Sequence, residues 1–150
     1  MFDAAIEVQT PLDLIVVCGK NAKLKAKLEK VDTPERHRVQ VMGFTKEMDE
    51  LLAIADLIVS KPGGLTTSEC LARGVPMAIV NPIPGQESRN SDFLLEHGAA
   101  IKINSLAAMT YKLDELLGNK PRLATLARNA RAQGKPHAAR AICERAIAMV

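Results

Sequence analysis

Short runs of aliphatic and β-branched residues alternate in this chain with segments of helical periodicity, and this alternation constrains the fold strongly. The runs predict strands at Leu14–Cys18, Val39–Met42, Leu57–Val59, Met77–Val80 and Ala100–Ile103. They are apolar on both faces, which is typical of a parallel sheet covered on both sides. The predicted helices are Asn21–Lys30, Lys46–Ala55, Thr66–Arg73, Glu87–His97, Ser105–Leu117, Pro121–Gln133 and His137–Met149. The order predicts an α/β fold with a Rossmann-like, doubly wound parallel sheet.

Composition favours one domain over residues 1–150, because 47% of the residues are hydrophobic and can form a core. A net charge of +3 and 3% aromatic residues are too little to predict nucleic-acid binding. The three histidines and three cysteines lack the spacing of metal ligands, so no metal site is predicted. We expect a cytoplasmic protein, since neither a signal peptide nor an apolar run of membrane-spanning length is visible.

The segment Ser60–Glu69 carries the strongest chemical signal, because ligands of open α/β sheets bind beyond the carboxyl ends of the strands. Gly63 and Gly64 allow positive φ and a close approach of the backbone to a ligand. The helix that follows would offer unpaired N–H groups to an anion such as a diphosphate. A capping box between Thr66 and Glu69 in an ordinary tight turn explains the same residues, and the pattern alone leaves both interpretations open.

Three other strand ends carry weaker signals. After Met77–Val80 come Gln86, Glu87 and Asn90, whose groups could bind sugar hydroxyls or simply begin a surface helix. Gly43 and Phe44 follow the second strand: their backbone could pair with a base, or the Phe44 ring could enter the core. Gly19 and Asn21 follow the first strand, and Asn21 is also a good helix N-cap.

Five short motifs occur in one order: Val16–Asn21, Val41–Phe44, Ser60–Glu69, Pro82–Asn90 and Gly98–Ala100. This series resembles the donor-binding, C-terminal lobe of monogalactosyldiacylglycerol synthases and processive diacylglycerol glucosyltransferases. It is similar, more distantly, to the N-acetylglucosaminyltransferase that makes the peptidoglycan lipid intermediate. The resemblance covers nearly the whole chain, and five motifs in order are far more specific than any one of them.

The resemblance implies the C-terminal lobe of a GT-B glycosyltransferase. Such an enzyme transfers glucose or galactose from a UDP-sugar to a lipid such as diacylglycerol, with inversion and without a metal or other cofactor. The matching positions are Gly43 and Phe44 for uracil, Gly63, Gly64, Leu65 and Thr66 for the diphosphate, Glu69 for the ribose, Gln86, Glu87 and Asn90 for the sugar, and Gly19 and Asn21 nearby. The catalytic base is expected in the other, acceptor-binding lobe, so no catalytic residue is assigned.

Two parts of the family pattern are absent from these residues: the acceptor lobe, and the first strand of the donor lobe with its Gly-rich turn. The missing strand predicts a gap in the middle of the sheet. We expect the chain alone to bind UDP weakly and to transfer no sugar. The full enzyme would lie at the inner face of the membrane through the acceptor lobe.

Other functions fit the sequence to different degrees. A non-catalytic nucleotide-sugar-binding module, or the donor subunit of a two-chain glycosyltransferase, would share all these ligand contacts. A UDP-sugar epimerase is disfavoured because the expected acid and base residues are not found. A dinucleotide oxidoreductase is disfavoured because no GxGxxG motif occurs.

Overall fold

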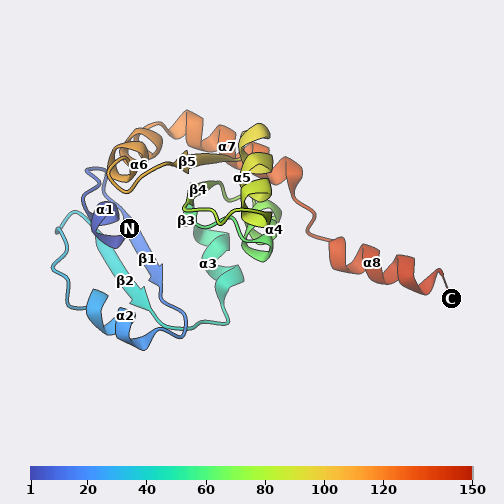
Figure 1. Ribbon diagram of the computed structural model, residues 1–150, viewed down its shortest axis with the longest axis horizontal. Helices are drawn as coiled ribbons and strands as arrows, with labels where there is room; N and C mark the ends of the chain where they lie inside the picture. Colours follow the sequence, from blue (N-terminus) through green and yellow to red (C-terminus); the bar gives the residue numbers. More distant parts are fainter. Residues whose placement is uncertain (150) are drawn as a thin grey trace.

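The computed structural model describes residues 1–149, in which parallel strands alternate with helices (Figure 1). The strands are β1 (Asp13–Val17), β2 (Arg38–Met42), β3 (Ile58–Ser60), β4 (Met77–Val80) and β5 (Ala100–Ile103). The helices are α1 (Phe2–Ile6), α2 (Ala22–Leu28), α3 (Met48–Ile54), α4 (Gly64–Arg73), α5 (Gln86–Glu96), α6 (Met109–Gly118), α7 (Lys120–Gln133) and α8 (Ala138–Ile147).

The strands form two parallel sheets, one of order β1-β2 and one of order β3-β4-β5. Asp13 pairs with Arg38 at the start of the first sheet, and Met77 lies between Ile58 and Ala100 in the second. A doubly wound sheet places its first strand between its second and fourth. When the missing strand is counted as the first, β1 and β3 are the second and fourth strands of that order. The break lies between these two strands, so the predicted gap in the middle of the sheet is confirmed.

Two buried clusters cover the two faces of the three-stranded sheet. One contains Met77 and Ile79 with side chains of α3, α4, α5 and α7. The other contains Ala78 and Val80 with side chains of α1 and α6, and residues from β1 and β3 also pack against it. This second cluster therefore joins the two sheets, although no strand hydrogen bonds connect them.

The predicted boundaries hold within two residues, with one exception: α6 begins at Met109, four residues after the predicted start. The Ser105 hydroxyl and carbonyl both accept from the Ala108 N–H, 3.2 Å away in each case, and so close a turn before the helix. Predicted burial of all strands on both faces was wrong for β1 and β2, neither of which contains a buried residue. Ile15 and Val17 are 37% and 39% exposed, because β1 has a neighbour on one side only.

The connection between α1 and β1 is fixed by Asp114 on α6. Its carboxylate accepts hydrogen bonds of 2.9 Å from the N–H groups of Gln9 and Thr10 and one of 3.0 Å from the Thr10 hydroxyl. Burial raises the pKa of this carboxyl, but these hydrogen bonds and the charge of Arg36 outweigh burial and hold the pKa below 3.8. The charged form of Asp114 therefore stabilises the fold.

Replacing Asp114 with Asn is expected to lower the free energy of unfolding by about 1–2 kcal/mol near neutral pH, because the amide nitrogen cannot accept these bonds. A group with a depressed pKa contributes its stability above its unfolded pKa and loses it as pH falls through the folded pKa. The difference from wild type in urea denaturation should thus be largest at neutral pH and vanish in strong acid. Asp92→Asn, at an exposed position on α5, is the control. A difference that persists in strong acid would contradict this role.

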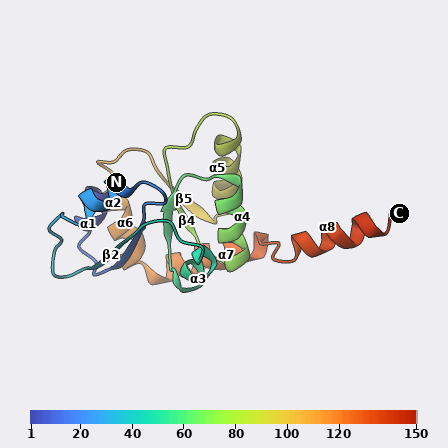
Figure 2. The same cartoon turned by 90° about the horizontal axis from the view of Figure 1, so that it is seen from below.

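The helix α8 extends away from the rest of the molecule in both views (Figures 1 and 2), and all of its residues are exposed. Its apolar side chains include Ile142 and Ile147, which are 68% and 76% exposed. Among the residues described, no helix combines the length and hydropathy required to cross a bilayer.

Candidate functional site

The N-terminus of α4 presents three unpaired backbone donors. Gly63 is the N-cap, with φ −63° and ψ 151°, and the first paired amide is that of Thr67, which donates to the Gly63 carbonyl at 2.8 Å. Within residues 1–149 the N–H groups of Gly64, Leu65 and Thr66 have no hydrogen-bond partner. Such donors, at the positive end of a helix dipole, are a type of group that binds anions.

Two expectations about this segment were wrong. Neither Gly63 nor Gly64 has positive φ, because the chain enters the helix from an extended conformation. A capping box between Thr66 and Glu69 does not form, because the helix begins at Gly64 and both residues lie inside it. The Glu69 side chain is exposed and free of hydrogen bonds within the described residues, so it can accept from a ligand.

The loop after β4 lies beside this helix start. A Cβ placed on Gly64 would lie 3.3 Å from Nε2 of the Gln86 side chain, so the first residue of α5 faces the first residue of α4. Asn90, one turn further along α5, donates to the Pro62 carbonyl at 2.8 Å. The adjacency of β3 and β4 brings the two predicted segments together, and Asn90 fixes the position of one against the other.

Glu87 has an internal role in the same loop. Its carboxylate accepts from the Ile83 N–H at 2.7 Å and so closes the turn that leads into α5. Gly85 begins that helix with φ 105°, a conformation that glycine adopts readily. Asn81, directly after β4, also has a positive φ of 41°, and no pattern in the sequence predicts it. Of the three predicted sugar-binding side chains, only Gln86 has no hydrogen-bond partner within residues 1–149.

The loops after β1 and β2 form a second pair. A Cβ on Gly43 would lie 3.8 Å from the Gly19 carbonyl oxygen, and the Lys20 ammonium lies 6.0 Å from the centre of the Phe44 ring. That ring is 64% exposed, so it does not pack in the core. The Phe44 N–H and carbonyl are unpaired within residues 1–149 and are available to a base. Asn21 caps α2 by accepting from the Leu24 N–H at 3.0 Å, which confirms the N-cap role predicted for it from the sequence.

Buried polar groups lie behind α4. Thr67 is only 6% exposed, and its hydroxyl has no hydrogen-bond partner among residues 1–149; the same holds for the hydroxyl of the fully buried Ser91. Burial first, and the charge of Glu69 second, raise the pKa of the Cys70 thiol to about 12, so Cys70 stays neutral. The sequence pattern missed Ser91, because only packing of α5 shows its burial.

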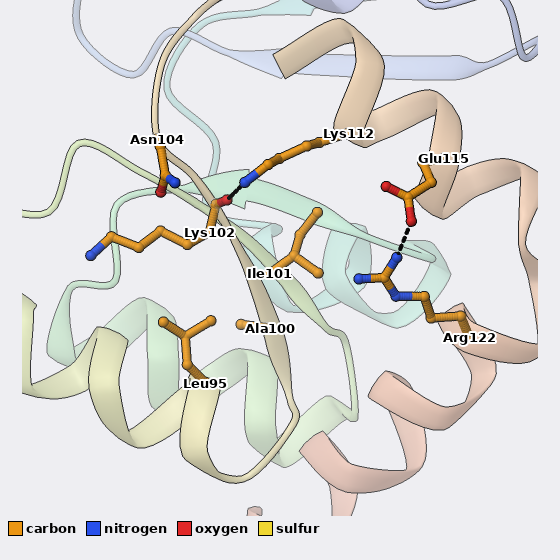
Figure 3. Close-up of a pocket in the computed structure, with 8 residues that line it drawn as sticks. All are labelled: Leu95, Ala100, Ile101, Lys102, Asn104, Lys112, Glu115 and Arg122. Carbon is orange, nitrogen blue, oxygen red and sulfur yellow. Dashed lines mark hydrogen bonds and ion pairs between the residues drawn. The ribbon is translucent and has the colours of Figure 1, made fainter. Parts of the chain in front are cut away.

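A hollow of about 440 Å³ lies along the free edge of β5, and none of its lining residues belongs to the loops described above (Figure 3). Two of its three cations are engaged within the chain: Lys112 donates to the Lys102 carbonyl at 2.6 Å, and Arg122 pairs with Glu115 at 2.5 Å (Figure 3). We therefore place the site at the strand ends. In the part of the chain that the structure describes, no group of three His, Cys, Asp or Glu side chains could hold a metal ion.

A parallel α/β domain with unpaired amides at a helix N-terminus beyond its strand ends has the architecture typical of nucleotide-binding domains. Residues 3–142 match the family model of the glycosyltransferase family 28 C-terminal domain, and the chain belongs to this family. The structure is also similar to the crystal structure of Acinetobacter baumannii MurG. The TM-score is 0.81 at 26% identity, over 95% of this chain and 43% of that one.

Curated relatives agree with this assignment. The chain is 33% identical over 140 residues to a processive diacylglycerol beta-glucosyltransferase of Bacillus pumilus, covering 93% of the chain and 37% of the relative. It is 36% identical over 118 residues to the protein of that name from Bacillus subtilis, covering 79% of the chain and 31% of the relative. The family and these relatives are glycosyltransferases, and the chain spans about a third of the relatives' length.

Proposed function

We propose that residues 1–150 form the donor-binding domain of an inverting glycosyltransferase, which holds a UDP-sugar while glucose or galactose passes to a lipid such as diacylglycerol. The observation that carries the proposal is the unpaired amides of Gly64, Leu65 and Thr66, with Gln86 beside them. The lipid acceptor rests on the names of the relatives.

The proposed contacts follow the two pairs of loops. The diphosphate would accept from the amides at the start of α4, Glu69 would accept from the ribose hydroxyls, and Gln86 would bind the sugar. Gly43 and Phe44 would offer their backbone to uracil. Negative charge grows on the departing UDP during transfer, and fixed amide donors stabilise such charge. These donors would do so without a metal or other cofactor.

The catalytic base and the acceptor would belong to an acceptor lobe or subunit outside these residues, which would also contact the inner face of the membrane. The isolated chain should therefore bind UDP and transfer no sugar. A donor subunit of a two-chain enzyme is the second candidate, because it would use the same contacts to the nucleotide sugar.

Glu69→Ala is expected to weaken UDP binding about tenfold or more, because hydrogen bonds between the ribose and a charged group are lost. Calorimetric titration with UDP, UDP-glucose, UDP-galactose and UDP-N-acetylglucosamine measures this and ranks the donors. Glu96→Ala removes an equal charge at the other end of α5 and serves as the matched control. No heat with any ligand would refute the donor-binding role, and unchanged affinity in Glu69→Ala would remove that residue from the site.

A further inference from the structure

Positive charge is concentrated on and around α2. Five of the eleven lysines, none of the nine arginines and a single glutamate lie within residues 20–30. Lys23 and Lys27 belong to α2, and Lys30 lies in the turn after it, where its N–H donates to the Lys27 carbonyl at 3.3 Å. The spacing i, i+4, i+7 places these three lysines on one side of the helix, which we call the lysine face. The buried residue of α2, Leu28, falls on the side turned to the protein.

The lysine face has no counter-charge within the residues described. All three of its lysines are exposed, and none of them forms an ion pair within residues 1–149. Glu29, the one carboxylate of the segment, pairs with Lys25 instead. Like charges at i, i+4 destabilise a helix, so Lys23 and Lys27 weaken α2 rather than support it. An anionic surface outside the protein would offset this repulsion.

The basic residues of α7 and α8 are engaged to a greater extent. Arg122 of α7 pairs with Glu115, and Arg140 of α8 pairs with Glu144. In both views, α2 lies at the opposite end of the molecule from α8 (Figures 1 and 2). The lysine face is therefore a separate surface, and it is the one whose lysines lack ion-pair partners within residues 1–149.

Exposed apolar side chains border the lysine face. Leu24, which follows Lys23, is 40% exposed. Before the helix, the Lys20 ammonium lies 6.0 Å from the centre of the Phe44 ring, which is 64% exposed. Lysines beside exposed apolar side chains are typical of surfaces that lie on a bilayer. There the charges meet anionic headgroups, and the apolar groups enter between them.

We propose that the lysine face rests on the anionic surface of a lipid bilayer, with Leu24 entering the headgroup region. Arginine forms the fixed, two-pronged contacts of specific phosphate recognition, whereas lysine is a flexible point charge. A face of lysines without arginine therefore matches headgroups that change place beneath it. Nucleic acid fits less well, because single strands are bound by stacked aromatic side chains and the chain is 3% aromatic. This contact would be made by the donor-binding domain itself, in addition to that of the acceptor lobe, and would not require bound nucleotide.

Vesicle sedimentation with the chain of residues 1–150 tests this contact. The wild type should bind vesicles of phosphatidylglycerol but not of phosphatidylcholine, and high salt should release it, since salt screens exposed charges. The combined variant Lys23→Gln, Lys27→Gln and Lys30→Gln should bind about 100-fold more weakly, because each lysine near an anionic surface contributes about fivefold.

The matched control removes the same charge from three exposed lysines outside α2 and should keep most of the vesicle binding: Lys102→Gln, Lys120→Gln and Lys135→Gln. Circular dichroism of both combined variants should match the wild type. Calorimetric titration with UDP should also give the wild-type affinity for the lysine-face variant, so that bilayer binding and nucleotide binding can fail separately.

Tryptophan fluorescence locates the contact, because the chain contains no tryptophan of its own. The emission of Leu24→Trp should shift to shorter wavelength when phosphatidylglycerol vesicles are added. The emission of Ile142→Trp, at a position 68% exposed on α8, should not shift.

Several results would overturn bilayer contact by the lysine face. They are no binding to phosphatidylglycerol vesicles, equal binding to phosphatidylcholine, equal losses in the two combined variants, or a shift for Ile142→Trp as large as that for Leu24→Trp. Displacement from vesicles by single-stranded DNA at equal phosphate concentration would assign the lysine face to nucleic acid and refute the bilayer as its partner.

Discussion

Gly64→Pro should weaken UDP binding by about 10- to 100-fold without unfolding the chain. Proline removes the Gly64 N–H, which has no partner within the protein, and places a ring carbon where the phosphate would lie. A charge-assisted hydrogen bond of this kind contributes about 1.5–3 kcal/mol. The measurement is calorimetric titration with UDP.

The position suits proline in every other respect. Gly64 is the first residue of α4, where proline is well tolerated. Gly63 has φ −63° and ψ 151°, the extended conformation that a residue before proline requires. Gly64→Ala is the matched control, since it keeps the N–H while adding a Cβ near the flexible Gln86 side chain. Equal affinities of the Ala and Pro variants, with both folded, would remove this amide from the diphosphate site.

Gly134→Ala should lower the free energy of unfolding by about 1–3 kcal/mol, because an added methyl group overpacks a close backbone contact. Gly134 follows α7 with an ordinary φ of −64°. A Cβ there would overlap the Leu71 carbonyl oxygen and lie 2.9 Å from its carbonyl carbon, in α4. Backbone cannot move aside as a side chain can, so α7 must shift from α4.

Gly118→Ala provides the comparison, since the same substitution at the end of α6 meets nothing within 4 Å. It should stabilise the chain by about 0.5–1 kcal/mol, because alanine restricts the unfolded chain and favours helix. Urea denaturation of both variants measures the two effects. Equal changes would show that the contact between α7 and α4 contributes little.

Gly64→Pro and Gly134→Ala act on opposite ends of the same helix, α4. The first turn of α4 offers the amides proposed to bind diphosphate. Its last turn packs against α7 and ends at Arg73, which donates to Asp49 of α3 at 2.7 Å. Because a ligand site needs fixed donors, packing at the far end of α4 supports the geometry at its start. We expect Gly134→Ala to weaken UDP binding slightly as well.

Most of the fold was predictable because periodicity reports local structure directly. β4 and β5 have the predicted bounds, since their aliphatic runs end abruptly at polar residues or proline. The start of α4 was placed two residues late, because the glycine pair was interpreted as a turn while Gly64 already has helical geometry. The start of α6 was misplaced because the Ser105 turn uses the same residue types as a helix N-terminus.

The candidate site was also predictable in part from the sequence. Sequence order identified the segments around Gly64, Gln86 and Phe44, since residue type and position after a strand are local properties. It could not show that Asn90 binds the Pro62 carbonyl or that Glu87 closes its own loop, because both depend on distances between segments. Among the described residues, those contacts leave Gln86 as the one proposed sugar-binding side chain without an internal partner.

By itself, the sequence determined the alternation of strands and helices, the family, and the absence of one strand from the middle of the sheet. Only the tertiary structure decided which amides of α4 remain unpaired, which polar side chains are already engaged, and that Ile15 and Val17 of β1 remain exposed. The reason is physical: periodicity and residue type act between neighbours along the chain, whereas burial and hydrogen-bond partners are set by segments that meet only in three dimensions.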